Sequence, residues 1–181
     1  NVGHIQSTDL GFISDLYDLY GLVIADSGLT RLDPHWFDNK PDLLILDISG
    51  NPITDISTLF GLTRLRKLNL SNTDIADLSP LRKSMNLREI DISYTEVTDL
   101  SVFLRFTLAE QILLQGFQGR DISPLIELKK GDIDKVLRRV DLTGAVVVPC
   151  SQMTELRGLG VNIAVEVQPG VTCPADFPAD L

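Results

Sequence analysis

Two cysteines and two histidines are the side chains of this 181-residue chain best suited to metal binding or nucleophilic catalysis. His4 and His35 lie far in sequence from Cys150 and Cys173, so the chain shows no Cys–His arrangement typical of a catalytic nucleophile or a zinc site. It has no Gly-x-Ser-x-Gly elbow and no Walker-type Gly-Lys-Ser/Thr, and the Gly-Leu-Gly at 158–160 lacks the rest of a dinucleotide fingerprint. The sequence therefore predicts a protein that is not an enzyme and that has no cofactor or bound metal.

The overall charge argues against two further classes of partner. The chain has 25 acidic and 16 basic side chains, a net charge of -9 and an isoelectric point near 4.6. Proteins that bind nucleic acid or anionic membranes normally have the opposite balance. The most apolar stretch, 145–148, ends at Pro149 and is far shorter than the roughly 18 to 20 residues of a membrane helix. We therefore expect no nucleic-acid partner and no membrane insertion.

Apolar residues recur with a period of 22. Each copy has seven apolar positions, which in the first copy are Leu43, Leu46, Ile48, Ile53, Ile56, Leu59 and Leu62. Further copies begin at residues 65, 87 and 109, and a fifth fits if its start is moved from 131 to 137. Apolar residues fill 33 of the 35 positions, against about 15 expected from the average composition. The chain is therefore an array of structural repeats.

The array has a distinct segment at each end. A looser copy occupies residues 19–32, and a half repeat before it would cap the open core. Apolar residues alternate with period two over 161–167, as in a half-buried strand. We expect an N-terminal cap over residues 1–18, about six repeats over 19–158 with an insertion near 129–136, and a C-terminal cap strand and tail over 159–181.

The repeat pattern resembles that of the leucine-rich repeat family, L-x-x-L-x-L-x-x-N/T-x-L, over residues 19–156. The 22-residue length and the phrases Asp-Leu-Ser-Pro-Leu at 77–81 and Asp-Ile-Ser-Pro-Leu at 121–125 are similar to the bacterial internalin-like subgroup. The resemblance implies an α/β fold, namely a right-handed solenoid with a parallel concave sheet and with short α or 3₁₀ helices on its convex side. It also implies a bacterial surface or secreted protein that contacts another protein.

The residues themselves explain why such a repeat turns back on itself. An L-x-L stretch has strand alternation, so its leucines point inward and its x positions face outward, with strands about 4.8 Å apart. A serine follows two positions after an aspartate in four copies, at Asp55, Asp77, Asp99 and Asp121. Serine is a good helix N-cap, and Pro80 and Pro124 suit the first helical position. We expect these columns to cap short convex helices.

The ninth position of each copy favours Asn or Thr, whose side chain can satisfy backbone groups inside the turn. Asn51, Thr73 and Thr95 meet this need, whereas Phe117 and Ala145 cannot. The solenoid should therefore be irregular at these two positions. The insertion beside them should bulge from one edge, either as a tolerated loop or as part of a binding face.

The two cysteines leave two interpretations open. Cys150 fills a core position of the last copy and Cys173 lies in the tail. A disulfide between them would fix the C-terminal cap and indicate a secreted or cell-surface protein, whereas two separate thiols would favour the cytoplasm.

The outward positions of the strands form columns that cross the repeats and are the expected binding surface. Tyr94 beside Leu113, flanked by arginines, has the composition of an interface hot spot, although a plain solvated face is an alternative. The predicted partner-binding residues are Tyr94, Leu113, Arg66, Arg88, Asp47, Asp91, Gln115 and Arg138. A calcium ion shared by Asp47, Asn69 and Asp91 is an alternative, but an exposed sheet face offers few oxygens.

Three functions remain compatible with this surface. The principal hypothesis is a non-enzymatic module that binds a protein on its concave face. A carbohydrate or small-ligand receptor would favour several exposed aromatic side chains, and the concave columns supply only Tyr20 and Tyr94. An intracellular scaffold or regulatory subunit would be supported by free thiols.

Overall fold

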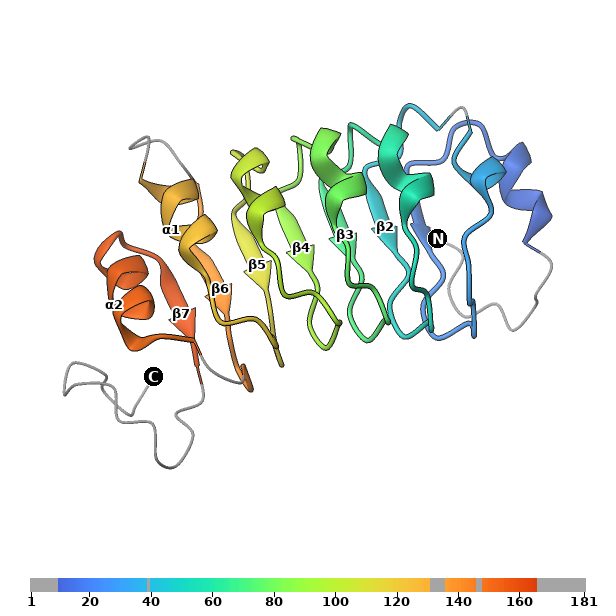
Figure 1. Cartoon of the computed structure of the whole chain (residues 1–181). Helices are drawn as coiled ribbons and strands as arrows, with labels where there is room; N and C mark the ends of the chain where they lie inside the picture. The colour runs from blue at the N-terminus through green and yellow to red at the C-terminus, as the bar shows by residue number, and fades with distance from the viewer. Residues whose placement is uncertain (1–9, 39, 131–135, 146–147, 166–181) are drawn as a thin grey trace.

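Seven short strands form one parallel sheet in sequence order (Figure 1). The computed structural model describes residues 10–38, 40–130, 136–145 and 148–165. The strands are β1 (Gly21–Val23), β2 (Ile45–Asp47), β3 (Lys67–Asn69), β4 (Glu89–Asp91), β5 (Gln111–Leu113), β6 (Arg139–Asp141) and β7 (Asn162–Ala164). Each pairs with the next, and from β2 to β5 the register is the one that the 22-residue period predicts, so Leu46 lies beside Leu68 and Leu68 beside Ile90.

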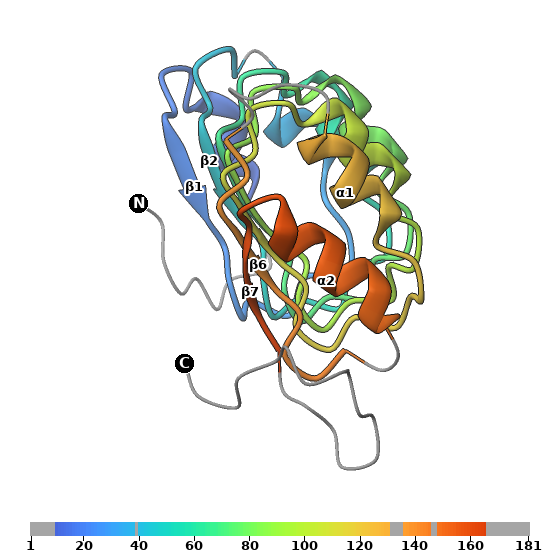
Figure 2. The ribbon, with the colours of Figure 1, turned by 90° about the vertical axis from the view of Figure 1, so that its left-hand side faces the viewer.

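Short helical turns cover the opposite side of the molecule from the sheet (Figure 2). Five are 3₁₀ turns: η1 (Gly11–Asp15), η2 (Pro34–Trp36), η3 (Ser57–Gly61), η4 (Ser79–Lys83) and η5 (Ser101–Arg105). The last two are the α-helices α1 (Ser123–Lys129) and α2 (Cys150–Gly158). The predicted solenoid, with its parallel concave sheet and its α or 3₁₀ convex side, is confirmed.

One continuous apolar core runs along the solenoid between these two layers. The inward position of every strand is buried, and so are the apolar positions of the convex turns, such as Leu59 and Leu81. Leu10 and Ile13 close the N-terminal end of this core, and Val161 and Ile163 belong to it at the other end. The core is therefore a stack of layers that each need a neighbour.

Asn51 holds the first turns together from the inside, as its position in the repeat predicts. Its side chain is fully buried, and its Oδ1 accepts bonds from the backbone N–H groups of Ser27 and Leu29, both at 3.0 Å. Its Nδ2 donates to the carbonyls of Ile24, Ile48 and Ser49 at 2.7 to 3.1 Å. The amide thus satisfies backbone groups of two successive repeats inside the turn.

In the next two repeats a threonine occupies the same position and satisfies one backbone carbonyl each. The hydroxyl of Thr73 donates to the Leu70 carbonyl at 2.6 Å, and that of Thr95 donates to the Ile92 carbonyl at 2.7 Å. Phe117 fills the same position as a buried apolar group. The irregularity expected there lies on the convex side, where α1 replaces the 3₁₀ turn, while the pairing of β5 with β6 is uninterrupted.

The repeated Asp-x-Ser phrase works differently from the prediction. Ser79 is the first residue of η4 and accepts no capping bond; its N–H and hydroxyl instead donate to Asp77 at 2.7 and 2.8 Å. The same two bonds recur at the start of η3, η5 and α1. Aspartate is therefore the capping residue, because its carboxylate can accept from both donors at once. The two prolines consequently occupy the second helical position rather than the first.

Replacing Asn51 by alanine should destabilise the fold strongly. Four backbone groups would lose their partners in the turn, so we expect the free energy of unfolding to fall by about 3 kcal/mol or more. The Thr73→Val variant, which removes one hydrogen bond, should cost only about 1 kcal/mol. Urea unfolding followed by circular dichroism measures both. Equal losses in the two variants would contradict the role assigned to the amide.

The aspartate caps should make stability depend on pH in the acid range. Bonds from the backbone N–H and hydroxyl of Ser79 hold the pKa of Asp77 below its ordinary value, and Ser123 acts in the same way on Asp121. The folded protein therefore binds these protons more weakly than the unfolded chain. The stabilisation is complete above the ordinary aspartate pKa of about 4 and is lost as the pH falls through the lowered values.

The Asp77→Asn/Asp121→Asn variant should show this loss less strongly. Its amide oxygens can still accept the serine N–H bonds but do not titrate, so the urea midpoint should fall less between about pH 5 and about pH 2.5. A matched control is Asp74→Asn/Glu96→Gln, whose exposed carboxylates accept no hydrogen bond within the described part of the chain. The control should keep the slope of the natural protein. An unchanged slope in the cap variant would exclude the carboxylates as the cause.

Candidate partner-binding face

The concave sheet presents rows of side chains that are in register from strand to strand. The first outward position gives the row Ile45, Lys67, Glu89, Gln111 and Arg139, and the second gives Asp47, Asn69, Asp91, Leu113 and Asp141. Between them the inward residue of each strand is buried. The backbone pairing thus fixes which side chains meet, one repeat apart along each row.

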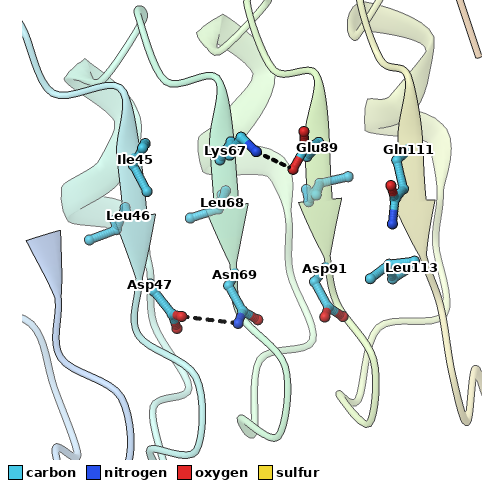
Figure 3. A pocket seen from close by; sticks show the side chains of 11 residues that line it. Ile45, Leu46, Asp47, Lys67, Leu68, Asn69, Glu89, Asp91, Gln111 and Leu113 are labelled. Atoms are coloured by element: carbon cyan, nitrogen blue, oxygen red, sulfur yellow. Dashed lines mark hydrogen bonds and ion pairs between the residues drawn. The ribbon is translucent and has the colours of Figure 1, made fainter. Parts of the chain in front are cut away.

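A shallow hollow of about 260 Å³ crosses β2 to β5 on this face (Figure 3). Ile45 and Leu113 lie at its two ends, and charged side chains lie between them. Three of the predicted partner-binding residues line it, namely Asp47, Asp91 and Leu113. The hollow also includes Ile45, Lys67, Glu89 and Gln111, which the prediction of binding residues did not contain. They occupy an outward column that is visible in the repeat alignment, so the signal for them is present in the sequence.

Ion pairs connect neighbouring strands at the strand-start side of the face. The Lys67 ammonium lies 2.7 Å from a carboxylate oxygen of Glu89, and the Arg88 guanidinium lies 2.5 Å from that of Glu110. These pairs are largely exposed, so each contributes little to stability. Of the other predicted arginines, Arg66 and Arg138 are exposed just before β3 and β6. The structure therefore places the predicted arginines along one margin of the face rather than in the hollow.

The acidic row is already engaged with the protein's own donors. One oxygen of Asp47 accepts from the N–H and hydroxyl of Ser49 at 3.0 and 2.6 Å, and the other accepts from Asn69 at 3.2 Å. Asp91 likewise accepts from the Ser93 N–H at 2.9 Å. Among the described residues no group of three His, Cys, Asp or Glu side chains is arranged to hold a metal ion. The row thus orders the turns that follow the strands.

Gln115 and Asp141 form a second polar group at the C-terminal end of the face. The Gln115 amide donates to Asp141 at 3.1 Å, Arg139 lies 3.5 Å away, and the Thr143 N–H donates at 3.0 Å. Burial alone would raise the pKa of Asp141, but the bonds from Thr143 and Gln115 and the charge of Arg139 outweigh it, so the pKa is lowered. Asp141 is therefore a buried anion whose role is to fix its neighbours.

Tyr94 has an unusual backbone for an aromatic residue. It follows β4 with φ of 55°, in the left-handed region, and its side chain is 55% exposed. The equivalent position in other repeats is also left-handed and holds Asp26, Gly50, Asn72 and Gly116. Gly, Asn and Asp tolerate this conformation, whereas a bulky side chain there is an outlier. The sequence pattern alone did not identify this column, because its backbone angle is set by the turn and not by the apolar period.

Two side chains near the outward columns have surroundings that the repeat pattern does not reveal. The Tyr94 ring lies on Gly116, three residues beyond Leu113, since a Cβ placed at Gly116 would come within 2.8 Å of the ring. Leu44, which belongs to the same column as the exposed Arg66 and Arg88, is only 7% exposed. A leucine gains by lying against its neighbours, whereas an arginine must keep its guanidinium in water.

Cys150 is disulfide-bonded at the start of α2, where it packs against the core. The expected partner, Cys173, lies outside the described residues, so its pairing with Cys150 stays a prediction. In the described ranges no helix is long and apolar enough to cross a membrane.

The matching family models and curated relatives agree on the nature of the repeats. A model described as "Leucine rich repeat" matches residues 18–75, and one described as "Leucine Rich repeats (2 copies)" matches residues 63–105. Toll-like receptor 9 of the dog is 47% identical over 58 residues, which are 30% of this chain and 6% of the receptor. The human receptor is 45% identical over 60 residues, or 31% and 6%. The chain thus spans only a small part of the length of the curated relatives that it matches.

Solved structures with the same fold include two internalins of Listeria monocytogenes. The internalin inlF has a TM-score of 0.68 and 22% identity over 86% of this chain and 45% of its own. Internalin C2 has a TM-score of 0.65 and 26% identity over 85% of this chain and 74% of its own. A leucine-rich repeat protein of Leptospira interrogans has a TM-score of 0.71 and 16% identity, covering 85% and 38%.

Leucine-rich repeat proteins are typically non-enzymatic modules for protein–protein interaction. The repeat spacing, the continuous parallel sheet and both family models lead to the same assignment. The chain is a leucine-rich repeat protein whose repeats resemble those of internalins.

Proposed function

We propose that this chain is a non-enzymatic module that binds a partner protein on its concave face. The observation that carries the proposal is Tyr94, a bulky aromatic residue at a left-handed position that other repeats give to Gly, Asn or Asp. Residues held in such conformations cost free energy and are concentrated at functional sites. A tyrosine that stays 55% exposed at such a position fits the anchor of an interface.

The rest of the face supports a protein rather than a small ligand. The hollow is shallow, with apolar side chains at its ends and the Lys67–Glu89 pair across its middle. Small-molecule sites are concave and mostly apolar, whereas protein interfaces combine apolar anchors with polar groups that select the partner. Leu113 near one end and the tyrosine beyond it would form the apolar centre, with Arg66, Arg88 and Arg138 along the rim.

We further propose that the protein acts outside the cytoplasm, on a bacterial surface or in a secreted form. The similarity to internalins and the disulfide-bonded state of Cys150 support this location. Disulfides persist in oxidising compartments and are rare in the cytosol. The partner would then be a protein of a host or neighbouring cell.

The Tyr94→Ala/Leu113→Ala/Arg88→Ala variant tests the binding face. A partner is first captured by cross-linking to the natural protein and identified, and its affinity is then measured by titration calorimetry with each variant. We expect the triple variant to bind at least 30-fold more weakly, because a loss of about 2 kcal/mol is typical of one hot-spot residue. A control of exposed residues away from the face is Tyr17→Ala/Arg120→Ala, which should bind as the natural protein does.

A single substitution separates binding from folding. Tyr94→Gly removes the ring but relieves the left-handed backbone, so the urea midpoint should stay equal or rise slightly while binding weakens about tenfold. If the captured partner binds the triple alanine variant and the Tyr94→Gly variant with unchanged affinity, the concave face is not the interface. A loss of binding that follows a loss of stability in the glycine variant would assign the tyrosine to the fold instead.

The redox state of the cysteines tests the proposed location. Protein taken from its native compartment should take up no alkylating reagent before reduction and two equivalents after it, because both cysteines are oxidised. Intact mass spectrometry counts the adducts. Two adducts without reduction would overturn the extracytoplasmic location and favour an intracellular scaffold.

A further inference from the structure

Charge is sorted between the two edges of the solenoid. The segments 60–66, 82–88 and 104–110 lead from the convex turns into β3, β4 and β5, and they contain six basic residues and one acidic residue, Glu110. The segments 48–56, 70–78, 92–100 and 114–122 lead from the strands to the turns, and they contain six acidic residues and one basic residue, Arg120. We call the first edge the basic edge. It lies where the strands begin, along the top of Figure 1.

Most cations of the basic edge have no anionic partner. Arg64 and Arg88 pair with Asp42 and Glu110. Within the described part of the chain, ion pairs are absent at the other four, which are Arg66, Arg82, Lys83 and Arg105. This is unusual in a protein with nine excess negative charges. The edge is thus a local positive field on an acidic molecule.

Two of these cations lie beside the same aromatic ring. The Arg82 guanidinium carbon lies 4.5 Å from the centroid of the Phe60 ring, and the Lys83 ammonium lies 4.1 Å from the same centroid. Each gains from the ring, but two like charges beside one ring repel each other. An anionic group placed near both would relieve that repulsion.

Large apolar side chains are exposed among the cations. Met85, Leu104 and Leu108 are 56%, 47% and 38% exposed. The amide of Asn86 donates to the Thr63 carbonyl of the preceding repeat at 2.9 Å, and Leu108 and Met85 occupy the positions that correspond to Asn86 and Thr63 one repeat later. Leu104 occupies in η5 the position that Arg82 has in η4 and Phe60 has in η3. The apolar and basic groups therefore lie at neighbouring positions of three successive repeats, as a patch of mixed character on one edge.

The field of the whole molecule decides between the anionic partners that this patch could take. A nucleic acid or an anionic membrane extends far beyond the patch and would meet the net negative charge and the acidic opposite edge. A short peptide segment that stays on the patch interacts electrostatically mainly with charges within a Debye length, about 8 Å at physiological ionic strength. Methionine and arginine beside exposed leucines are also the composition of a protein interface.

We propose that the basic edge docks a short acidic segment of another protein, one that alternates carboxylates with apolar side chains. The carboxylates contact Arg82, Lys83 and Arg105, and the apolar side chains cover Met85, Leu104 and Leu108. These six residues lie outside the concave hollow and are not among the residues proposed to bind the concave partner. Occupancy of this surface therefore does not depend on that partner.

A labelled peptide of about 12 residues, with Glu and Leu in alternating pairs, is the probe. Fluorescence anisotropy should show binding that weakens as the salt concentration rises, and a peptide with Lys in place of Glu should not bind. The Arg82→Glu/Arg105→Glu variant should bind the acidic peptide at least tenfold more weakly. The control variant Arg31→Glu/Arg120→Glu changes the net charge equally at exposed arginines outside the patch and should change the affinity less than twofold.

Three outcomes would overturn the proposal. Equal weakening in both charge-reversal variants would show that the peptide senses only the net charge. Unchanged binding in a folded Arg82→Glu/Arg105→Glu variant would exclude the basic edge. Urea unfolding checks the fold, and if this variant does not fold, Arg82→Gln/Arg105→Gln is tested in its place. Binding to vesicles containing about 30% phosphatidylglycerol, or to duplex DNA, would assign the edge to that macromolecule instead. The Tyr94→Ala/Leu113→Ala variant, which changes no residue of the basic edge, should weaken binding of the concave partner and leave peptide binding unchanged, which separates the two surfaces.

Discussion

Burial of the inward side chains against neighbouring repeats is the constraint on which the rest of this structure depends. A single 22-residue copy offers one leucine-lined strand and one short turn, and neither can exclude water alone. Stacking joins the copies into one core that extends from Leu10 to Ile163. Because the strands must pair in register for this stacking, the outward side chains also fall into fixed rows. The binding face is thus a consequence of how the core is buried.

The fold was predictable from the sequence because the same positions are buried in each copy. The result is a periodic apolar pattern that average composition does not produce. The paired strands, the convex turns and the roles of Asn51 and Thr73 were all predictable from position in the repeat. The exchange of roles between Asp77 and Ser79 was not, since serine and aspartate both favour helix starts and only the geometry shows which side chain accepts. Periodicity specifies which positions are inward, but not the hydrogen bonds between neighbouring polar residues.

For the candidate site, the sequence predicted which side chains lie on the outward side of the sheet but not how exposed each of them is. The repeat alignment places Asp47, Asp91 and Leu113 outward, and all three line the hollow. It also places Leu44 outward, yet that side chain is buried, because an apolar group at an outward position can lie down on the surface of the sheet. The left-handed backbone of Tyr94 gives the strongest indication of selection on this face, and it required coordinates. Strain of this kind is visible only when the other repeats show what the turn prefers.

The same comparison between repeats separates structural from functional charge on the two edges. An aspartate before η3, η4, η5 and α1 accepts from the first N–H of the helix, and a cation in the last turn of η4, η5 and α1 interacts favourably with the carbonyl end. These demands recur in successive copies and account for a part of the charge sorting without any partner. They do not account for Met85, Leu104 and Leu108, which leave large apolar surface in water, or for two cations beside one ring. The part of the basic edge that exceeds the needs of the helices is therefore the part that a partner would recognise.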